Sequence, residues 1–328
     1  MRAAHSLLAL GVLAGLAGLA PSSSAKAPVV AFESTPGRLR ISVGDEPWGD
    51  YVYDDPVIVR PHFANLHAAG GVPVTRTQPP VAGRDLVDHP TFHPGLWLAF
   101  GDLNGADNWR LHAGIEHVEF AEAPHGKAGR GEFAALHRYF DGADPPVALC
   151  DELFRCQWVV LPEGTLLTWD STFSSDHRVE FGDQEEMGLG LRVATPLRAQ
   201  RQAEGDVPAG RGEIRDADGR RNEREVWGQS ARWCDYSGVV DGRRAGMTLL
   251  CHPDNFRPSW FHARDRGLLV ANPFGHAAFR QGEPSRVVLE PGQKLRLRFG
   301  ILVYAAASEA RPDLDAVYRR YLQLTQDE

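Results

Sequence analysis

The stretch that decides the fold is KLRLRF, residues 294–299, in which basic and apolar side chains alternate one for one. The stretch RLRISV, residues 38–43, alternates in the same way. A period of two is typical of a strand that buries one face and exposes the other. The chain also contains 34 Gly and 23 Pro, too many breaks for a helical protein. The sequence therefore predicts an all-β protein, a large sandwich of antiparallel sheets.

One helix is predicted at the C-terminal end, over residues 312–325. Its apolar positions follow the helical spacing i, i+3, i+4, i+7 and i+8. These positions are Leu314, Val317, Tyr318, Tyr321 and Leu322. We expect this helix to pack as a lid on the sandwich.

The first 25 residues have the three parts of a secretory signal peptide. Arg2 gives the positive start, residues 7–20 the apolar run, and Ser23-Ser24-Ala25 the small-residue cleavage site. The run is about 14 residues, short of the roughly 20 that span a bilayer. We expect an exported chain, periplasmic or extracellular, with residues 26–328 as one domain and no membrane span after cleavage. The alternative is an uncleaved N-terminal anchor.

The net charge of −8 indicates which partners to expect. Basic residues do not collect on any one segment, which argues against a nucleic acid partner. Sequence signatures of nucleotide cofactors and serine hydrolases are also missing, since the chain has no P-loop, no GxGxxG opening a βαβ unit and no GxSxG. We therefore expect no cofactor.

Four cysteines in an exported protein raise the question of disulfides. Cys150 and Cys156 lie on one predicted strand, about 20 Å apart, too far to bond. Cys234 and Cys251 flank a predicted hairpin with its turn at residues 241–243, and they can face each other across it. The sequence leaves two possibilities open for this pair, a disulfide or two buried thiols.

Three segments have the polar and aromatic composition of a binding site. They are residues 88–109 (DHPTFHPGLWLAFGDLNGADNW), residues 251–275 (CHPDNFRPSWFHARDRGLLVANPFG) and the acidic run 183–186 followed by Arg192. Gly-rich turns let a ligand approach the backbone, Trp offers a flat face to a sugar, and Arg can hold a carboxylate. The plainer alternatives are turn-capping Asp and Asn, core Trp and surface ion pairs.

The 13 histidines also suggest a metal site. His89 and His93 are four residues apart, a spacing that suits zinc on a helix but not a loop broken by Pro and Gly. The chain contains neither HExxH nor CxxC. We assign no metal ligands, although distant histidines can still assemble a site in the fold.

Read in order, these motifs resemble a known bacterial family. Residues 88–109, GIEH at 114–117, 183–197, 233–255 and 260–275 together resemble the domain of unknown function labelled "methane oxygenase PmoA-like". The resemblance implies a large antiparallel sandwich similar to the supersandwich of galactose mutarotases, and a sugar-derived ligand. Two positions depart from the family pattern: Phe92 stands where the family tends to have the first His of a pair, and Phe100 where it tends to have His before Gly-Asp. These changes put catalysis or metal binding in doubt.

The resemblance also implies a set of site residues. We expect His93 or His262 to transfer protons, with Glu186 as the partner carboxylate. Arg192 and Arg264 would hold an anionic or oxidised sugar, and Trp97 and Trp260 would be stacking platforms. The remaining expected ligand-binding residues are His89, Asp102, Asn104, Trp109, His117, His252, Asn255 and Asn272.

Three functions are compatible with these observations. The first is a secreted carbohydrate-active enzyme that hydrolyses, eliminates or epimerises a glycoside or modified sugar by His/Glu acid–base chemistry. The second is a non-catalytic sugar-binding or envelope scaffold protein. The third is a metal-dependent enzyme that uses clustered histidines.

Overall fold

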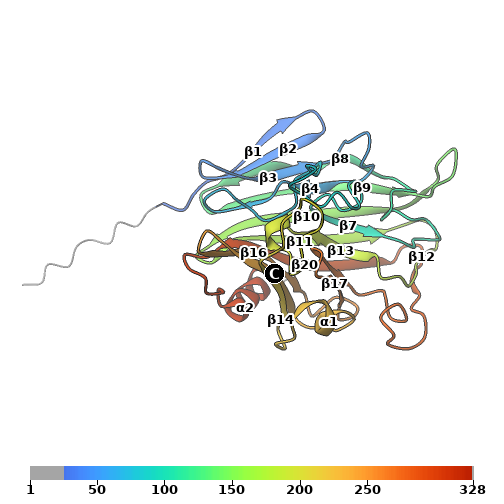
Figure 1. The fold of residues 1–328 in the computed structure, drawn as a ribbon. Helices are drawn as coiled ribbons and strands as arrows, with labels where there is room; N and C mark the ends of the chain where they lie inside the picture. The colour runs from blue at the N-terminus through green and yellow to red at the C-terminus, as the bar shows by residue number, and fades with distance from the viewer. Residues whose placement is uncertain (1–25, 327–328) are drawn as a thin grey trace, which may run out of the picture.

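The computed structural model describes residues 26–326, so the predicted signal peptide lies outside the described residues. These residues form two eight-stranded antiparallel sheets stacked face to face, with helix α2 (Leu314–Leu324) against the second sheet (Figure 1). The prediction of a large antiparallel β-sandwich with a C-terminal helix is confirmed. No helix within the described range is long and apolar enough to cross a membrane.

The first sheet has the order β1-β2-β3-β4-β7-β13-β18-β17. Its strands are β1 (Val30–Thr35), β2 (Arg38–Val43), β3 (Glu46–Val52), β4 (His62–Ala64), β7 (Leu96–Phe100), β13 (Met187–Arg192), β18 (Leu268–Asn272) and β17 (Trp260–Arg264). The second sheet has the order β14-β15-β16-β20-β11-β10-β9-β8. Its strands are β14 (Gly212–Asp216), β15 (Trp233–Val240), β16 (Arg243–Cys251), β20 (Lys294–Ala305), β11 (Gly164–Ser174), β10 (Ala148–Leu161), β9 (Arg130–Phe140) and β8 (Ile115–Lys127).

Shorter elements lie between the strands of the two large sheets. Strands β5 (His67–Ala68) and β6 (Val72–Pro73) form one small pair, and β12 (Val179–Phe181) and β19 (Val287–Leu289) form another. A 3₁₀ turn η1 (Thr195–Leu197) follows β13, and a five-residue helix α1 (Asn222–Val226) follows β14. Helix α1 was not predicted, because its five residues complete little more than one helical turn and show no helical repeat.

Strand β20 shows how far an alternating pattern extends. Leu297, Phe299 and Ile301 are fully buried between the sheets, as the alternation predicts. On the other face the side chains also become apolar from Leu302 onward, because α2 packs there. Thus only the first half of the strand has a wet face.

Helix α2 begins where the local sequence favours it. The carboxylate of Asp313 accepts a hydrogen bond from the backbone N–H of Ala316, at 2.9 Å, and so caps the N-terminus of the helix. Leu314, Val317 and Tyr321 then bury one stripe against the second sheet. The predicted lid is therefore present, with slightly shorter bounds than expected.

The β15–β16 hairpin bears on the cysteine prediction. Its turn residues Asp241 and Gly242 have φ angles of +50° and +73°, a two-residue turn that fixes the register. In that register Cys234 lies opposite Leu249, so Cys251 is its diagonal neighbour. Diagonal neighbours are about 7–8 Å apart, beyond the usual Cα separation of a disulfide. Of the two possibilities left open for Cys234 and Cys251, the structure shows the second: both are buried free thiols, as are Cys150 and Cys156.

Candidate functional site

The candidate site lies on the outer face of the first sheet, the face that points away from the second sheet. Along β7, Leu96 and Leu98 belong to the core between the sheets, whereas Trp97 points the other way into a separate buried cluster. The backbone register places Trp97 opposite Gly190, Gly190 opposite Val270, and Val270 opposite His262. Three strand spacings of about 4.8 Å therefore separate the backbones of Trp97 and His262, about 14 Å.

The facing residues from Trp97 to His262 form a row across the sheet, and Gly190 is the second residue of this row. A Cβ atom on Gly190 would lie 2.7 Å from Cζ2 of Trp97 and 2.9 Å from Cη2 of Trp109. Both indole rings thus lie directly over the backbone of β13, and both are fully buried. Neither indole N–H has a hydrogen-bond partner among the described residues. The expectation that Trp97 is an open stacking platform is corrected, since no part of its ring is exposed.

His93 is enclosed by four rings. Its imidazole stacks on Trp97 at 5.2 Å between ring centroids and 16° between planes, with His89 4.8 Å away. Phe92 and Trp109 approach it edge to face, at 5.7 and 6.0 Å. The side chain is 2% exposed, and within residues 26–326 neither ring nitrogen finds a hydrogen-bond partner. His93 is therefore a buried polar group with unused hydrogen-bonding capacity.

Burial and the positive charges around it keep the imidazole of His93 neutral. Burial lowers the pKa of His93 well below the usual value, and the positive charges of Arg192, Arg60 and Arg76 lower it further. A neutral imidazole presents one N–H donor and one acceptor nitrogen. His93 is thus suited to exchange hydrogen bonds with a hydroxyl group.

Two of these arginines hold the covering loops in place. Arg60 donates to the backbone carbonyls of Phe92 and Trp109, and Arg76 donates to those of Asp88 and His93. Burial lowers the pKa of Arg60 to about 9 and that of Arg76 to about 10, so both stay charged at neutral pH. The sequence did not identify either arginine, because each lies far from the loop that it holds.

Arg192 has a partner of its own. Its guanidinium donates to Asp88 at 2.7 Å, and its side chain is 3% exposed. Burial tends to raise the pKa of Asp88, but Arg192 and Arg76 outweigh it and lower that pKa overall. Arg192 therefore holds the start of the 88–93 loop to β13, and its buried guanidinium is already ion-paired. The expectation that it binds an anionic sugar is corrected accordingly.

His262 and Glu185 form a partly exposed acid–base pair at the other end of the row. His262 Nδ1 lies 3.3 Å from the backbone carbonyl of Glu185, which assigns the proton to Nδ1 and leaves a lone pair on Nε2. Nε2 is 3.5 Å from the Glu185 carboxylate, without hydrogen-bond geometry. Burial, followed by the charge of Arg264, lowers the pKa of His262 to about 4. Two hydrogen-bond acceptors, Nε2 of His262 and the carboxylate of Glu185, thus face each other. This arrangement suits a ligand group that donates a hydrogen bond, such as a hydroxyl.

Arg264 completes this end of the row. It donates to Glu185 at 3.0 Å and to Glu223 at 2.9 Å, and its guanidinium lies over the ring of Trp227. The side chains of Glu185 and Arg264 are 35% and 37% exposed, so solvent reaches the pair. The buried indole N–H of Trp227 has no partner in the described part of the chain.

The partner carboxylate of His262 is Glu185 and not the predicted Glu186. Glu186 forms an ion pair with Arg110, which also bonds Asp107. The chain bends at these two residues, and the two carboxylates have different partners: Glu185 faces His262 and Glu186 faces Arg110. The sequence placed both carboxylates in one acidic run but did not distinguish between them.

Several predicted residues on the first sheet have structural roles. Asp102 and Asn104 close a tight turn, in which Asp102 accepts from the N–H of Gly105 and Asn104 from that of Glu180. Asn272 donates to the carbonyls of Gln184 and Glu185, and so holds the acidic run against β18. His89 is exposed above His93, and half-buried Trp260 lies beside His276 at 5.4 Å. The last two remain candidates for ligand contact.

Three predicted residues belong to the second sheet instead. His117 lies on β8 and packs against Tyr53, with 4.5 Å between ring centroids. His252 packs against Tyr321 of α2, and Asn255 exchanges two hydrogen bonds with the backbone of Arg298 on β20. The structure therefore does not bring these three together with His93 or His262.

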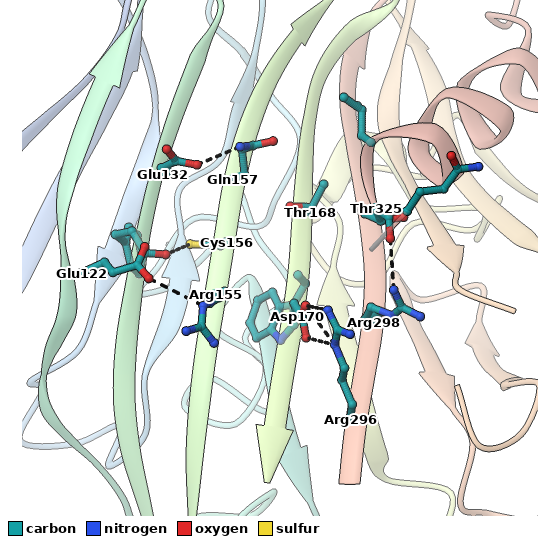
Figure 2. Close-up of a pocket in the computed structure, with 14 residues that line it drawn as sticks. Glu122, Glu132, Arg155, Cys156, Gln157, Thr168, Asp170, Arg296, Arg298 and Thr325 are labelled. Atoms are coloured by element: carbon teal, nitrogen blue, oxygen red, sulfur yellow. Dashed lines mark hydrogen bonds and ion pairs between the residues drawn. The ribbon is translucent and has the colours of Figure 1, made fainter. Parts of the chain in front are cut away.

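A polar cleft of about 310 Å³ on the outer face of the second sheet is a competing candidate (Figure 2). Its charged side chains are already paired: Asp170 with Arg296, Glu122 with Arg155, and Glu132 with Gln157. None of its lining residues has a buried polar atom without a partner. It therefore lacks the unused hydrogen-bonding groups that mark the face of the first sheet.

A metal centre would need several ligating side chains gathered in one place. Residues 26–326 contain no group of three or more His, Cys, Asp or Glu side chains that could hold a metal ion. The pair His89 and His93, suggested by its spacing, stacks ring on ring at 4.8 Å.

Comparison with known proteins gives a family and two distant structural neighbours. A galactose mutarotase-like protein from Lactobacillus casei aligns over 84% of this chain and 99% of its own, with 11% identity and a TM-score of 0.38. A galactose mutarotase related enzyme from Lactobacillus acidophilus aligns over 86% of this chain and 100% of its own, with 9% identity and a TM-score of 0.32. No curated protein matches the chain. A family model matches residues 38–318, and the chain therefore belongs to the family of unknown function DUF6807.

Proposed function

We propose that the outer face of the first sheet binds a sugar and transfers a proton to or from it. The observation that carries this proposal is the row of buried, unpartnered polar atoms on one face: both nitrogens of His93, the indole N–H groups of Trp97 and Trp109, and Nε2 of His262. Buried polar groups are normally hydrogen-bonded, so such a concentration favours a polar ligand. A polyhydroxylated ligand offers both donors and acceptors.

The chemistry is centred on His262 and Glu185. A ligand hydroxyl between them would donate to Nε2 of His262 or to the carboxylate, 3.5 Å apart. His262, with its pKa lowered to about 4, accepts hydrogen bonds at neutral pH and acts as a weak base. Arg264 balances the charge that remains on Glu185. Half-buried Trp260, on the same strand, supplies an aromatic face at the edge.

This arrangement favours proton transfer over two-carboxylate hydrolysis. Glycosidases of the common type need one free carboxylic acid and one free carboxylate. Here Glu185 is paired with Arg264, and Glu186 with Arg110. We therefore place epimerisation or elimination of a sugar before hydrolysis. Because residues 1–25 have the parts of a secretory signal peptide, we also propose that the protein works outside the cytoplasm. We further propose that the family labelled "methane oxygenase PmoA-like" is the same family as DUF6807.

A binding protein without catalysis is the second candidate. The enclosure of His93 by His89, Phe92, Trp97 and Trp109 favours it, because a ligand reaches that imidazole only if the covering loop moves. Under this proposal the same face would hold the sugar through hydrogen bonds and release it unchanged.

One experiment separates the two functions. Titration calorimetry against neutral and acidic mono- and disaccharides measures binding, and NMR of the same mixtures in D₂O detects epimerisation, elimination or cleavage. We expect His262→Gln and Glu185→Gln to abolish turnover, while His177→Gln, at an exposed position, retains it. Binding without turnover in the wild type establishes the second candidate. Sugar binding unchanged in both site variants would refute the placement of the site.

A further inference from the structure

A cavity of about 710 Å³ lies at one end of the sandwich, outside the face described above. Its walls come from the β5–β6 region, from η1 and from the end of the β15–β16 hairpin, and include Leu66, Leu197 and Val240. Three prolines, at positions 73, 196 and 208, also line it. Cavities of about 300–1,000 Å³ with mainly apolar walls are the usual size and character of small-molecule sites.

The lining offers no stacking surface to a sugar ring. It contains no Trp, Tyr or Phe residue, so no aromatic face is available for a pyranose ring. The cavity is also separate from the row of unpartnered groups, since Thr75 lines it while the next residue, Arg76, donates to the 88–93 loop. Successive residues of an extended chain point to opposite sides. The occupant is therefore a second ligand, independent of the sugar.

The charges of the lining cancel. Arg84 and Arg211 oppose Asp85 and Asp241, giving a formal net charge of zero. The Asp85 carboxylate already accepts hydrogen bonds from Thr195 and from the backbone N–H of Val81. Arg84 pairs with Asp85, and Arg211 and Asp241 are exposed to solvent, so a charged ligand group in the apolar interior of the cavity would remain without a partner, which is costly.

The lining offers few polar contacts inside the cavity. The hydroxyl of Thr75 accepts from the backbone N–H of Leu66 at 2.9 Å and can donate its own proton to a ligand oxygen. His67 also lines the cavity, and its Nδ1 has no partner among the described residues. These groups suit one or two polar atoms on an otherwise aliphatic molecule.

We propose that this cavity binds an uncharged amphiphile, an aliphatic chain that carries a hydroxyl group. The volume, the aliphatic lining, the balanced charge and the polar groups at Thr75 and His67 are the observations that support it. The natural ligand belongs to this chemical class, and 1-octanol is the probe for it.

Calorimetric titration of the full-length protein with 1-octanol, octanoate and octylamine tests the proposal. We expect 1-octanol to bind, and each charged analogue to bind at least about tenfold more weakly because its charge has no partner. Val240→Trp and Ala209→Trp, introduced from two different lining segments, should each weaken 1-octanol binding at least about tenfold by filling the cavity. Val147→Trp is the matched control, because Val147 is 56% exposed elsewhere.

Each result decides the proposal. Wild-type affinity in both filling variants, with their unfolding midpoints preserved, would overturn it, as would tighter binding of octanoate or octylamine. No detectable binding of 1-octanol up to its solubility limit would also overturn it. If the wild type dimerises in sedimentation experiments and Val240→Trp does not, the occupant is a second copy of the chain. His262→Gln should leave 1-octanol binding unchanged, so failure here and failure of the proposed sugar site remain distinguishable.

Discussion

Replacing His93 by phenylalanine should stabilise the protein while removing part of the proposed ligand site. His93 is 2% exposed, and its two ring nitrogens have no partner within residues 26–326. Each buried polar group left unpaired costs about 1–3 kcal/mol, and a phenyl ring has no such groups. The ring is slightly larger than imidazole, and overpacking offsets part of the gain by about 1 kcal/mol or more. We expect a net gain of about 1 kcal/mol in the free energy of unfolding at pH 7.5.

The pH dependence of this gain is the sharper test. Because the pKa of folded His93 lies well below 6.5, the unfolded chain takes up a proton at that position in mild acid and the folded chain does not. His93 therefore lowers the stability of the wild type as the pH falls through 6.5, and His93→Phe removes this loss. From pH 7.5 to 5.0 the advantage of the variant should grow by about 2 kcal/mol, at 1.36 kcal/mol per pH unit below the unfolded pKa.

Urea unfolding followed by tryptophan fluorescence at both pH values measures this change. His177→Phe, at an exposed loop position, is the control and should change the free energy of unfolding by less than about 0.5 kcal/mol. A variant whose advantage does not grow in acid would refute the neutral, buried state of His93. If His93→Phe is more stable yet binds sugar as the wild type does, the unpartnered nitrogens of His93 do not serve the ligand.

Three further outcomes follow from the packing and the free thiols. Gly190→Ala should lower the free energy of unfolding by about 1–3 kcal/mol in urea unfolding, because its Cβ would lie within 3 Å of two buried indole rings. Gly114→Ala is the control: its Cβ would make only an ordinary contact, so its stability should stay near that of the wild type. Asp235→Ala should cost about 3–5 kcal/mol by the same measurement, since it leaves Arg311 without the fully buried carboxylate that it bonds at 2.8 Å; a loss below 1 kcal/mol would contradict this. Reducing agent should leave the unfolding midpoint unchanged, because all four cysteines are free, and a fall would show a disulfide.

The fold was predictable where one strand carries its own pattern. The alternation in 294–299 and 38–43 predicted strands with one wet face, and β20 and β2 span those residues. The helical spacing after Pro312 predicted α2 with bounds close to those observed. These patterns are local, because each depends on the repeat of one element and on which of its faces meets the core. The second, apolar face of β20 was not predictable, since it depends on α2 packing there.

The candidate site was predictable only in part. Residue types drew attention to segments 88–109 and 251–275, and the strand register places both on the outer face of the first sheet, at Trp97 and His262. Sequence proximity could not show that His252 turns toward the second sheet, ten residues before a histidine on the first. The choice of Glu185 over Glu186 likewise depends on a backbone bond to His262 across 77 positions.

The sequence by itself thus determined the class of fold, the C-terminal helix and the segments rich in site-forming residues, because periodicity and composition are properties of short stretches. Only the tertiary structure decided which of those residues meet, which arginines are already neutralised and which buried nitrogens have no partner. These properties depend on strand register and on side chains distant in sequence. A polar group finds or lacks a hydrogen-bond partner only in the packed structure, so the unpartnered groups of this face could not be seen in the sequence.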